Sequence, residues 1–207
     1  MTRIHILGAP GSGKTTLARQ LSEHLHVPHH DLDKLGLEKG RVSEEDAFAI
    51  AERPAWISEG VYLIWTEPLL YHAEVIVLLE VSWPVALWRI LLRHVTRSLH
   101  GTNPYPGLNG VRLLFKLMKD TREYLLNQEP AASPLAQSLH RYLEEQRVRS
   151  EPPTLDAVRR EARAYPELSF PPTDEFLHRY LSRYRQKVIR VGNKAERERL
   201  LTRLTPP

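Results

Sequence analysis

The chain has 207 residues, 42% of them apolar, and 29 basic against 25 acidic side chains, which gives a formal net charge of +4. This length and composition suit one globular domain with a sizeable core and exclude a disordered chain. The sequence contains no cysteine, which excludes disulfides, thiolate metal sites and thiol catalysis and suits a reducing compartment.

No apolar run reaches the roughly 18 residues of a membrane-spanning helix. The first residues carry one arginine and lead directly into an apolar strand rather than a signal peptide. We therefore expect a cytoplasmic protein without membrane contact.

The segment 8–16, GAPGSGKTT, fits the phosphate-binding P-loop pattern. Residues 4–7 before it predict a buried strand, and residues 16–26 after it predict an amphipathic helix. In that setting, backbone N–H groups at the helix N-terminus surround a phosphate, and glycines let the backbone approach it. A glycine-rich turn that fits by chance is the alternative.

We expect the whole loop to bind ATP, with Lys14 on the β- and γ-phosphates and the Thr15 hydroxyl on Mg²⁺. The nucleotide-binding residues expected here are Gly8, Ala9, Pro10, Gly11, Ser12, Gly13, Lys14, Thr15 and Thr16.

A second strand is predicted over residues 26–31, ending at Asp31 and followed by Asp33. Ligands of open α/β sheets bind beyond the carboxyl ends of the strands, so both carboxylates are candidates for metal or substrate contact. The alternative for Asp33 is that it caps the helix that follows. His29 and His30 are neighbours on a strand and point to opposite faces, so we expect structural roles for them.

Residues 36–42 are predicted to form a loop, and a helix that begins at Ser43 ends before Pro54. A third strand over residues 55–60 brings Glu59 to its carboxyl end. P-loop enzymes use a carboxylate to orient Mg²⁺. Glu59 is our first candidate and Asp31 the second, with a surface glutamate at a turn as the alternative for Glu59.

Residues 74–81 predict a strand covered on both faces, and Ser82 begins a long helix. Within this helix Arg89, Arg93 and Arg97 share one face at spacings of four residues. Guanidinium groups bind phosphate in a bidentate manner, so we expect this stripe to contact the transferring phosphate.

A turn-rich loop over residues 100–107 precedes helices predicted at 111–128, 134–149 and 155–164. Such a loop is typical of the tip of a mobile lid. We therefore expect residues 1–99 and 174–207 to form the core domain, and residues 100–173 a helical lid or insertion.

A helix is predicted over residues 174–185, a fifth strand over 187–191 and a last helix over 195–204. Asn193 lies between the last strand and helix, where P-loop proteins hold the nucleotide base. Residues 193–196 differ from the guanine-binding N-K-x-D motif by Glu196. We expect the backbone around Asn193 to contact adenine.

Seven basic side chains and one acid lie in residues 82–122. This basic segment predicts a polyanionic partner, either nucleotide phosphates or a nucleic-acid backbone. A solubilising helix surface is the alternative. No helix-turn-helix, zinc-finger or RNA-binding signature supports the nucleic-acid interpretation.

Together these segments resemble the adenylate-kinase-like proteins known as DNA topology modulation proteins. The resemblance covers residues 1 to about 120 and 174 to 204, whereas residues 123–172 are longer than the family suggests. Its matching stretches are Gly8 to Thr16, Asp31 to Asp33, Trp56 to Tyr62, Leu87 to Arg97 and Tyr184 to Val191.

The resemblance implies an α/β P-loop NTPase fold, with five parallel strands flanked by helices, that uses ATP and Mg²⁺. Nucleoside monophosphate kinases carry an arginine in the turn after the third strand, where this chain has Leu63. That difference argues against an ordinary nucleoside monophosphate kinase. The pair Asp31 and Asp33 resembles shikimate-type kinases, which implies that one carboxylate serves Mg²⁺ and the other the substrate hydroxyl.

Two functions follow as hypotheses. The first is a phosphotransferase that moves the γ-phosphate of ATP to a small acceptor, with Lys14, Asp33 and the three arginines as catalytic residues. The second is a nucleotide-dependent DNA-binding ATPase without a small acceptor.

Overall fold

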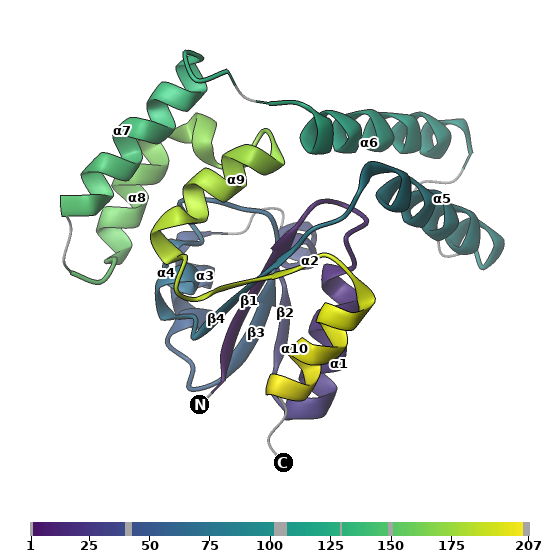
Figure 1. Cartoon of the computed structure of the whole chain (residues 1–207), viewed down its shortest axis with the longest axis horizontal. Helices are drawn as coiled ribbons and strands as arrows, with labels where there is room; N and C mark the ends of the chain where they lie inside the picture. The colour runs from purple at the N-terminus through teal and green to yellow at the C-terminus, as the bar shows by residue number, and fades with distance from the viewer. Residues whose placement is uncertain (1, 40–42, 102–106, 129, 149–150, 205–207) are drawn as a thin grey trace.

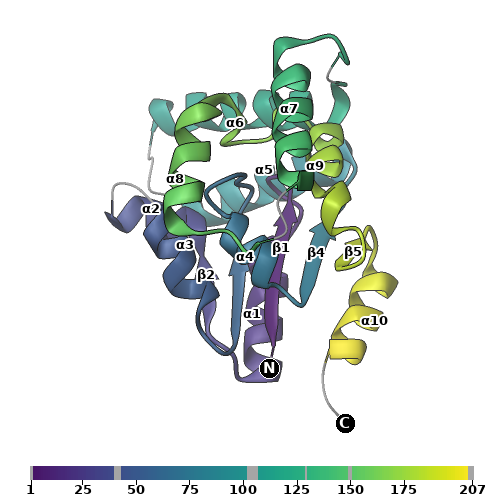
Figure 2. The ribbon, with the colours of Figure 1, turned by 90° about the vertical axis from the view of Figure 1, so that its left-hand side faces the viewer.

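A computed structural model describes residues 2–39, 43–101, 107–128, 130–148 and 151–204. Within these ranges the strands are β1 (Arg3–Gly8), β2 (His29–Asp31), β3 (Trp56–Glu59), β4 (Val75–Leu79) and β5 (Val188–Val191). They form one sheet in the order β2-β3-β1-β4-β5, and every neighbouring pair is parallel (Figures 1 and 2). The predicted fold class, a five-stranded parallel sheet flanked by helices, is confirmed.

The helices surround this sheet as the crossover connections of a parallel sheet require. They are α1 (Lys14–Leu25), α2 (Leu32–Lys39), α3 (Glu44–Ala51), α4 (Glu67–His72), α5 (Trp83–Leu99), α6 (Leu108–Leu126), α7 (Pro134–Val148), α8 (Leu155–Ala164), α9 (Asp174–Leu181) and α10 (Lys194–Leu204). Single 3₁₀ turns follow α8 at Pro166–Leu168 and α9 at Ser182–Tyr184.

One sequence-based prediction of local structure was wrong, and one helix was not predicted. Residues 36–39, expected in a loop, belong to α2, and residues 40–42 lie outside the described part of the chain. A carboxylate oxygen of Asp31 accepts the backbone N–H of Lys34 and caps the start of this helix. The helix α4 was missed because Pro68, which suits a first helical turn, was not weighed as a helix start.

Alternating side chains of the central strand pack into separate cores on the two faces of the sheet. Ile4 and Ile6 of β1 pack with α1 and α10 on one face. Leu7 packs on the other face with residues of α3, α4, α7 and α9. The strands β1, β3 and β4 are therefore covered on both faces, which explains the continuous apolar run of β4.

The buried carboxylate of Glu67 links α4 to α9 and to the 3₁₀ turn that follows α9. Glu67 accepts a hydrogen bond of 2.8 Å from the hydroxyl of Tyr180, and it also binds Arg183 and Tyr184. The guanidinium of Arg183 lies 4.8 Å from the centre of the Tyr180 ring. The tyrosine hydroxyls satisfy the buried carboxylate, whereas Nε and Nη1 of Arg183 are buried without a hydrogen-bond partner among the described residues.

The expected division into a core and a lid over residues 100–173 stays a prediction. Leu139, Tyr142, Tyr165 and Leu168, which lie within that range, belong to the core that covers one face of the sheet. We therefore expect any lid motion to be confined to α6, which packs on α5 at the side of the molecule away from α7 and α8 (Figure 1). None of the helices in the described ranges is both long and apolar enough to cross a bilayer.

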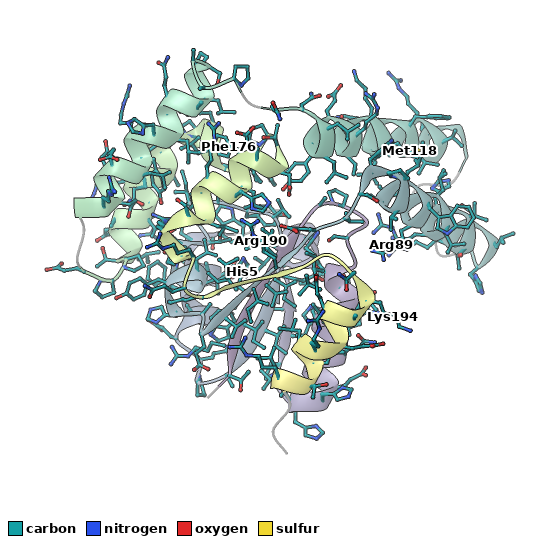
Figure 3. The ribbon with its side chains drawn as sticks, in the orientation of Figure 1. His5, Arg89, Met118, Phe176, Arg190 and Lys194 are labelled. Carbon is teal, nitrogen blue, oxygen red and sulfur yellow. The ribbon has the colours of Figure 1, made fainter. Side chains whose placement is uncertain are left out.

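His5 is fully buried within the sheet, where its Nδ1 lies 2.8 Å from the Ser58 hydroxyl (Figure 3). Burial lowers the pKa of this imidazole to about 4, although the charge of Glu59 opposes the shift. The folded protein therefore holds His5 neutral at pH values where an unfolded chain protonates it.

We predict that His5 makes folding sensitive to acid between pH 6.5 and 4. As the pH falls through this window, the unfolded chain binds a proton that the folded chain excludes, so stability falls by about 3 kcal/mol. Urea unfolding of the parent and of His5→Asn across this range measures the effect, and the exposed His24→Asn is the control. The prediction fails if His5→Asn and the parent lose stability equally over this window.

Candidate active site

The P-loop connects β1 to α1 in a conformation that depends on glycine. Gly11 and Gly13 have φ angles of 80° and 96°, in the left-handed region. Gly13 is the residue before α1, so the first free N–H groups of the helix open into the loop. The Lys14 ammonium donates to the carbonyl oxygens of Gly8 at 2.8 Å and Ala9 at 3.3 Å. This geometry is a cradle for phosphate with a cation at its edge.

A cleft of about 670 Å³ lies against this loop. It joins candidates from four separate elements: Lys14 and Thr15 from α1, Asp33 from α2, Glu59 from β3, and Arg89, Arg93 and Arg97 from α5. The loop residues Pro10, Gly11, Gly13 and Thr16 also line it. Gly8, Ala9, Ser12, Asp31 and Asn193 are not among its lining residues.

Glu59 lines the cleft from the carboxyl end of β3. Its side chain is buried, and its Oε1 lies 3.6 Å from His29 Nε2. Burial raises the pKa of Glu59, but the His29 ring, the Thr15 hydroxyl and the Lys14 charge outweigh burial and hold the pKa below its usual value. Glu59 is therefore an anion at neutral pH, next to the hydroxyl that we expect to ligate Mg²⁺.

This donor set fits Mg²⁺ as P-loop proteins hold it. Glu59 Oε1 is buried without a hydrogen-bond partner among the described residues, and the Thr15 hydroxyl is its neighbour. Within the same ranges no three His, Asp or Glu side chains come together as a metal site. Mg²⁺ commonly binds through one or two protein oxygens, water and substrate phosphates, so Thr15 and Glu59 would hold it together with bound nucleotide.

Asp31 lies beside Glu59 in the sheet register but has a structural task. It caps α2 through the N–H of Lys34 at 3.1 Å. Burial raises its pKa, with further contributions from the charges of Glu59 and Asp33, against the opposing bond from Lys34. Its role as a metal ligand stays a prediction.

The α5 arginines have different surroundings within the cleft. Arg89 donates to the carbonyl oxygens of Gly11 at 3.2 Å and Ser12 at 3.0 Å, so it fixes the loop from the side of α5 (Figure 3). Burial and the charge of Arg97 lower the pKa of Arg93, while Asp33 raises it. Arg197, from α10, also lines the cleft, and burial and Arg89 lower its pKa. Several cationic side chains thus line one cleft, and an anionic ligand would neutralise their positive charge.

Asn193 lies at the start of α10, where its side-chain oxygen accepts the N–H of Glu196 at 2.9 Å. Glu196 in turn accepts the N–H of Gly192 at 2.7 Å. The side chain of Asn193 therefore caps a helix, and the expected backbone contact with adenine stays a prediction.

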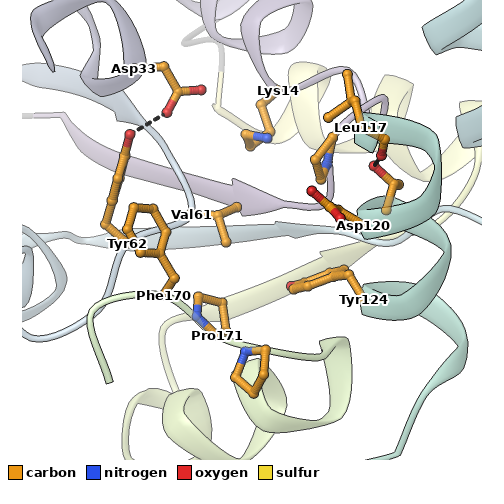
Figure 4. A pocket seen from close by; sticks show the side chains of 12 residues that line it. Lys14, Asp33, Val61, Tyr62, Leu117, Asp120, Tyr124, Phe170 and Pro171 are labelled. Carbon is orange, nitrogen blue, oxygen red and sulfur yellow. Dashed lines mark hydrogen bonds between the residues drawn. The ribbon is translucent and has the colours of Figure 1, made fainter. Parts of the chain in front are cut away.

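A second cavity, of about 450 Å³, continues from the cleft (Figure 4). The two share Pro10, Lys14, Asp33 and Leu117, so they meet where Lys14 and Asp33 lie. We call the second cavity the acceptor pocket. Its other walls are Val61, Tyr62, Asp120, Thr121, Tyr124 and residues 170–172. The Tyr62 hydroxyl donates to Asp33 at 2.8 Å and fixes that carboxylate at the junction.

The parallel sheet, its strand order and the phosphate-binding loop define a P-loop NTPase fold. No family model matches the chain. Adenylate kinase 1 of Nostoc sp. is 62% identical over 29 residues, which span 14% of this chain and 16% of that protein.

Two kinase structures illustrate the likeness to solved proteins. Shikimate kinase from Acinetobacter baumannii is 19% identical, with 72% of this chain and 96% of that chain covered and a TM-score of 0.35. A gluconokinase from Sinorhizobium meliloti 1021 is 18% identical, with 72% and 98% covered and a TM-score of 0.37. At these identities and TM-scores, the role of each residue has to follow from the geometry of this chain.

Three contributions to the site were missed from sequence. His29 was assigned a structural role, yet it contacts the candidate metal carboxylate. Arg197 was overlooked because its helix is far from the P-loop in the chain, although it lies near Gly13. Asp120 was counted only as an exception in a basic segment. The spacing of Leu117, Asp120 and Tyr124, which places them on one face of α6, is the signal that was available.

We predict that Gly11→Ala disrupts nucleotide binding, whereas Gly101→Ala does not. Both glycines have left-handed φ angles, so alanine costs about 1–2 kcal/mol at either position. A Cβ at Gly11 would also lie 2.9 Å from the Ala86 carbonyl oxygen, while one at Gly101 meets nothing within 4 Å. Titration with ATP should show at least about a tenfold loss of affinity for Gly11→Ala alone. Equal losses in both variants would refute the close fit of the loop against α5.

Proposed function

We propose that this protein is a P-loop phosphotransferase that moves the γ-phosphate of ATP to the hydroxyl of a small acceptor. The observation that carries the proposal is the junction of two cavities at Lys14 and Asp33. One cavity is lined by the phosphate cradle and arginines, and the other by carboxylates and aromatic rings. A protein that only bound or sensed a nucleotide would have no need of the second.

Lys14, at the junction, would contact the β- and γ-phosphates once they replace the loop carbonyls as its partners. Bound Mg²⁺ would neutralise developing phosphate charge, held near Thr15 and Glu59. Arg93 and Arg97 would add positive charge around the transferring group, which is the main catalytic contribution in phosphoryl transfer.

Asp33 is the candidate that orients the acceptor. In the transfer step, the acceptor oxygen bonds to the γ-phosphorus, and the bond from that phosphorus to the bridging oxygen breaks, leaving its electron pair on ADP. The hydroxyl proton passes to the Asp33 carboxylate and then to solvent. The bond from Tyr62 holds one oxygen of Asp33 and leaves the other available to the acceptor.

The DNA-dependent ATPase has less support than phosphoryl transfer. Arg89, Arg93 and Arg97, which supply much of the predicted basic segment, line the cleft of the P-loop. The outward face of α5 instead exposes apolar side chains, such as Trp88 at 65% and Leu99 at 81%. A surface for a phosphate backbone is expected to present cations rather than apolar groups. DNA binding stays an alternative that a titration at low salt tests.

We predict that Lys14→Ala impairs both ATP binding and phosphoryl transfer, whereas Asp33→Asn impairs phosphoryl transfer alone. Lys14→Ala should lower both ATP binding and turnover, by about 10² to 10³-fold in kcat/KM, because it removes charge stabilisation of the phosphates. Asp33→Asn should retain ATP binding but lower transfer by about 10² to 10⁴-fold, because the proton acceptor is lost. Release of ADP and formation of phosphorylated acceptor from γ-labelled ATP, across a panel of small alcohols, measure both effects.

Matched controls are Lys119→Ala and Asp156→Asn, which remove exposed charges outside both cavities. Both should behave as the parent does. Parent-like ATP binding and turnover in Lys14→Ala would overturn the proposed function.

A further inference from the structure

The charges of the acceptor pocket define which acceptors it can take. Asp33 and Asp120 both line it, and Lys14 is the only cation among its described lining residues. That lysine lies at the junction with the P-loop, where nucleotide phosphates would occupy it. A phosphorylated or carboxylated acceptor would therefore face two carboxylates, and no further guanidinium or ammonium among the described lining residues would bind it.

The proposed reaction gives a role to Asp33 but none to Asp120. It lies on the same face of α6 as Leu117 and Tyr124 and, among the described residues, has no hydrogen-bond or ion-pair partner. Figure 4 shows its side chain directed into the pocket. A carboxylate in a concave, mostly apolar wall is suited to bind a cationic group of a ligand.

The remaining walls are mostly apolar and include three aromatic rings. Tyr62 packs against Phe170 with ring centres 4.9 Å apart, and Phe170 is followed by two prolines that stiffen this wall. Phe170 remains 60% exposed, which is unusual for a phenylalanine with a core role. Aromatic rings around a site favour flat apolar ligands and also bind cationic nitrogen.

Tyr124 adds a separate indication of a ligand. Its side chain is 8% exposed, and its hydroxyl is buried without a partner among the described residues. Burial raises the pKa of this phenol, so the hydroxyl is protonated and can donate. A buried hydroxyl without a partner costs about 1–3 kcal/mol, and because it can accept as well as donate, a cationic nitrogen of a bound molecule would offset this cost.

From this pocket we infer that the phosphoryl acceptor is a small hydroxyl compound with a flat apolar body and a positively charged nitrogen. The inference rests on the proposed function. The hydroxyl would face Asp33 at the junction, the apolar body would pack between Tyr62, Phe170 and Tyr124, and the cationic nitrogen would bind Asp120.

Three probes that differ in a single group test this inference. They are 2-amino-1-phenylethanol, 1-phenylethanol and mandelate, which carry a positive, a neutral and a negative substituent beside the same phenyl ring and hydroxyl. Binding is measured by calorimetry with Mg²⁺ and a non-hydrolysable ATP analogue present, so that mandelate cannot occupy the P-loop. Phosphoryl transfer from ATP is measured separately for the same compounds.

We predict that the amine binds about threefold to tenfold more tightly than the neutral alcohol, and at least about tenfold more tightly than mandelate. Asp120→Asn should remove the preference of the amine over the neutral alcohol. Glu123→Gln, on the same helix but outside the pocket lining and paired with Lys119, should keep it. Circular dichroism of each variant confirms folding.

The inference and the proposed function fail in different ways. Equal or tighter binding of mandelate, a preference unchanged in Asp120→Asn, or no binding of any probe would overturn the inference, even if ATP is transferred to another acceptor. If the amine binds with the predicted preference but ATP phosphorylates none of the compounds, the ligand class of the pocket is supported and phosphoryl transfer to such ligands is contradicted.

Discussion

The parallel register of the sheet is the constraint on which the whole site depends. Because every strand pair is parallel, all carboxyl ends lie at one edge, where β1 ends at Gly8, β2 at Asp31 and β3 at Glu59. The register places Glu59 opposite both Ile6 and Asp31. A shift of one residue would turn Glu59 to the other face of the sheet and away from Thr15. The ladder hydrogen bonds and the two cores thus hold a charged site that would not assemble by its own attractions.

The site has two halves that meet at one lysine and one carboxylate. The P-loop half is cationic and is fixed by α1 and by the bonds from Arg89 of α5, and Arg197 of α10 lies near Gly13. The acceptor half is aromatic and acidic. Leu63, where nucleoside monophosphate kinases carry an arginine, is fully buried in the core and donates its N–H to Ser169. The absence of that arginine and the presence of Asp33 and Asp120 in the pocket both disfavour an acceptor that carries phosphate.

Much of this architecture could be predicted from local sequence. The P-loop, the five strands and the candidate carboxylate Glu59 each depend on neighbouring residues, whose periodicity and turn chemistry are visible in the chain. The acceptor pocket could not be predicted, since Asp33, Asp120 and Phe170 meet only through the packing of distant elements. Tyr62 illustrates the limit, because its bond to Asp33 depends on the fold of α2. Asp and Asn suit both helix caps and binding sites, so the residue type alone did not predict that Asp31 and Asn193 cap helices.

A structure of the protein with ADP, Mg²⁺ and a fluoride mimic of the transferring phosphate tests the central claim most directly. The account predicts that the mimic lies at the junction, bonded to the Lys14 ammonium, with the metal beside Thr15 and Glu59 and the open side of the mimic facing Asp33 and the acceptor pocket. A mimic that faces away from Asp33, or one whose charge is met without Lys14, would contradict phosphoryl transfer at this junction.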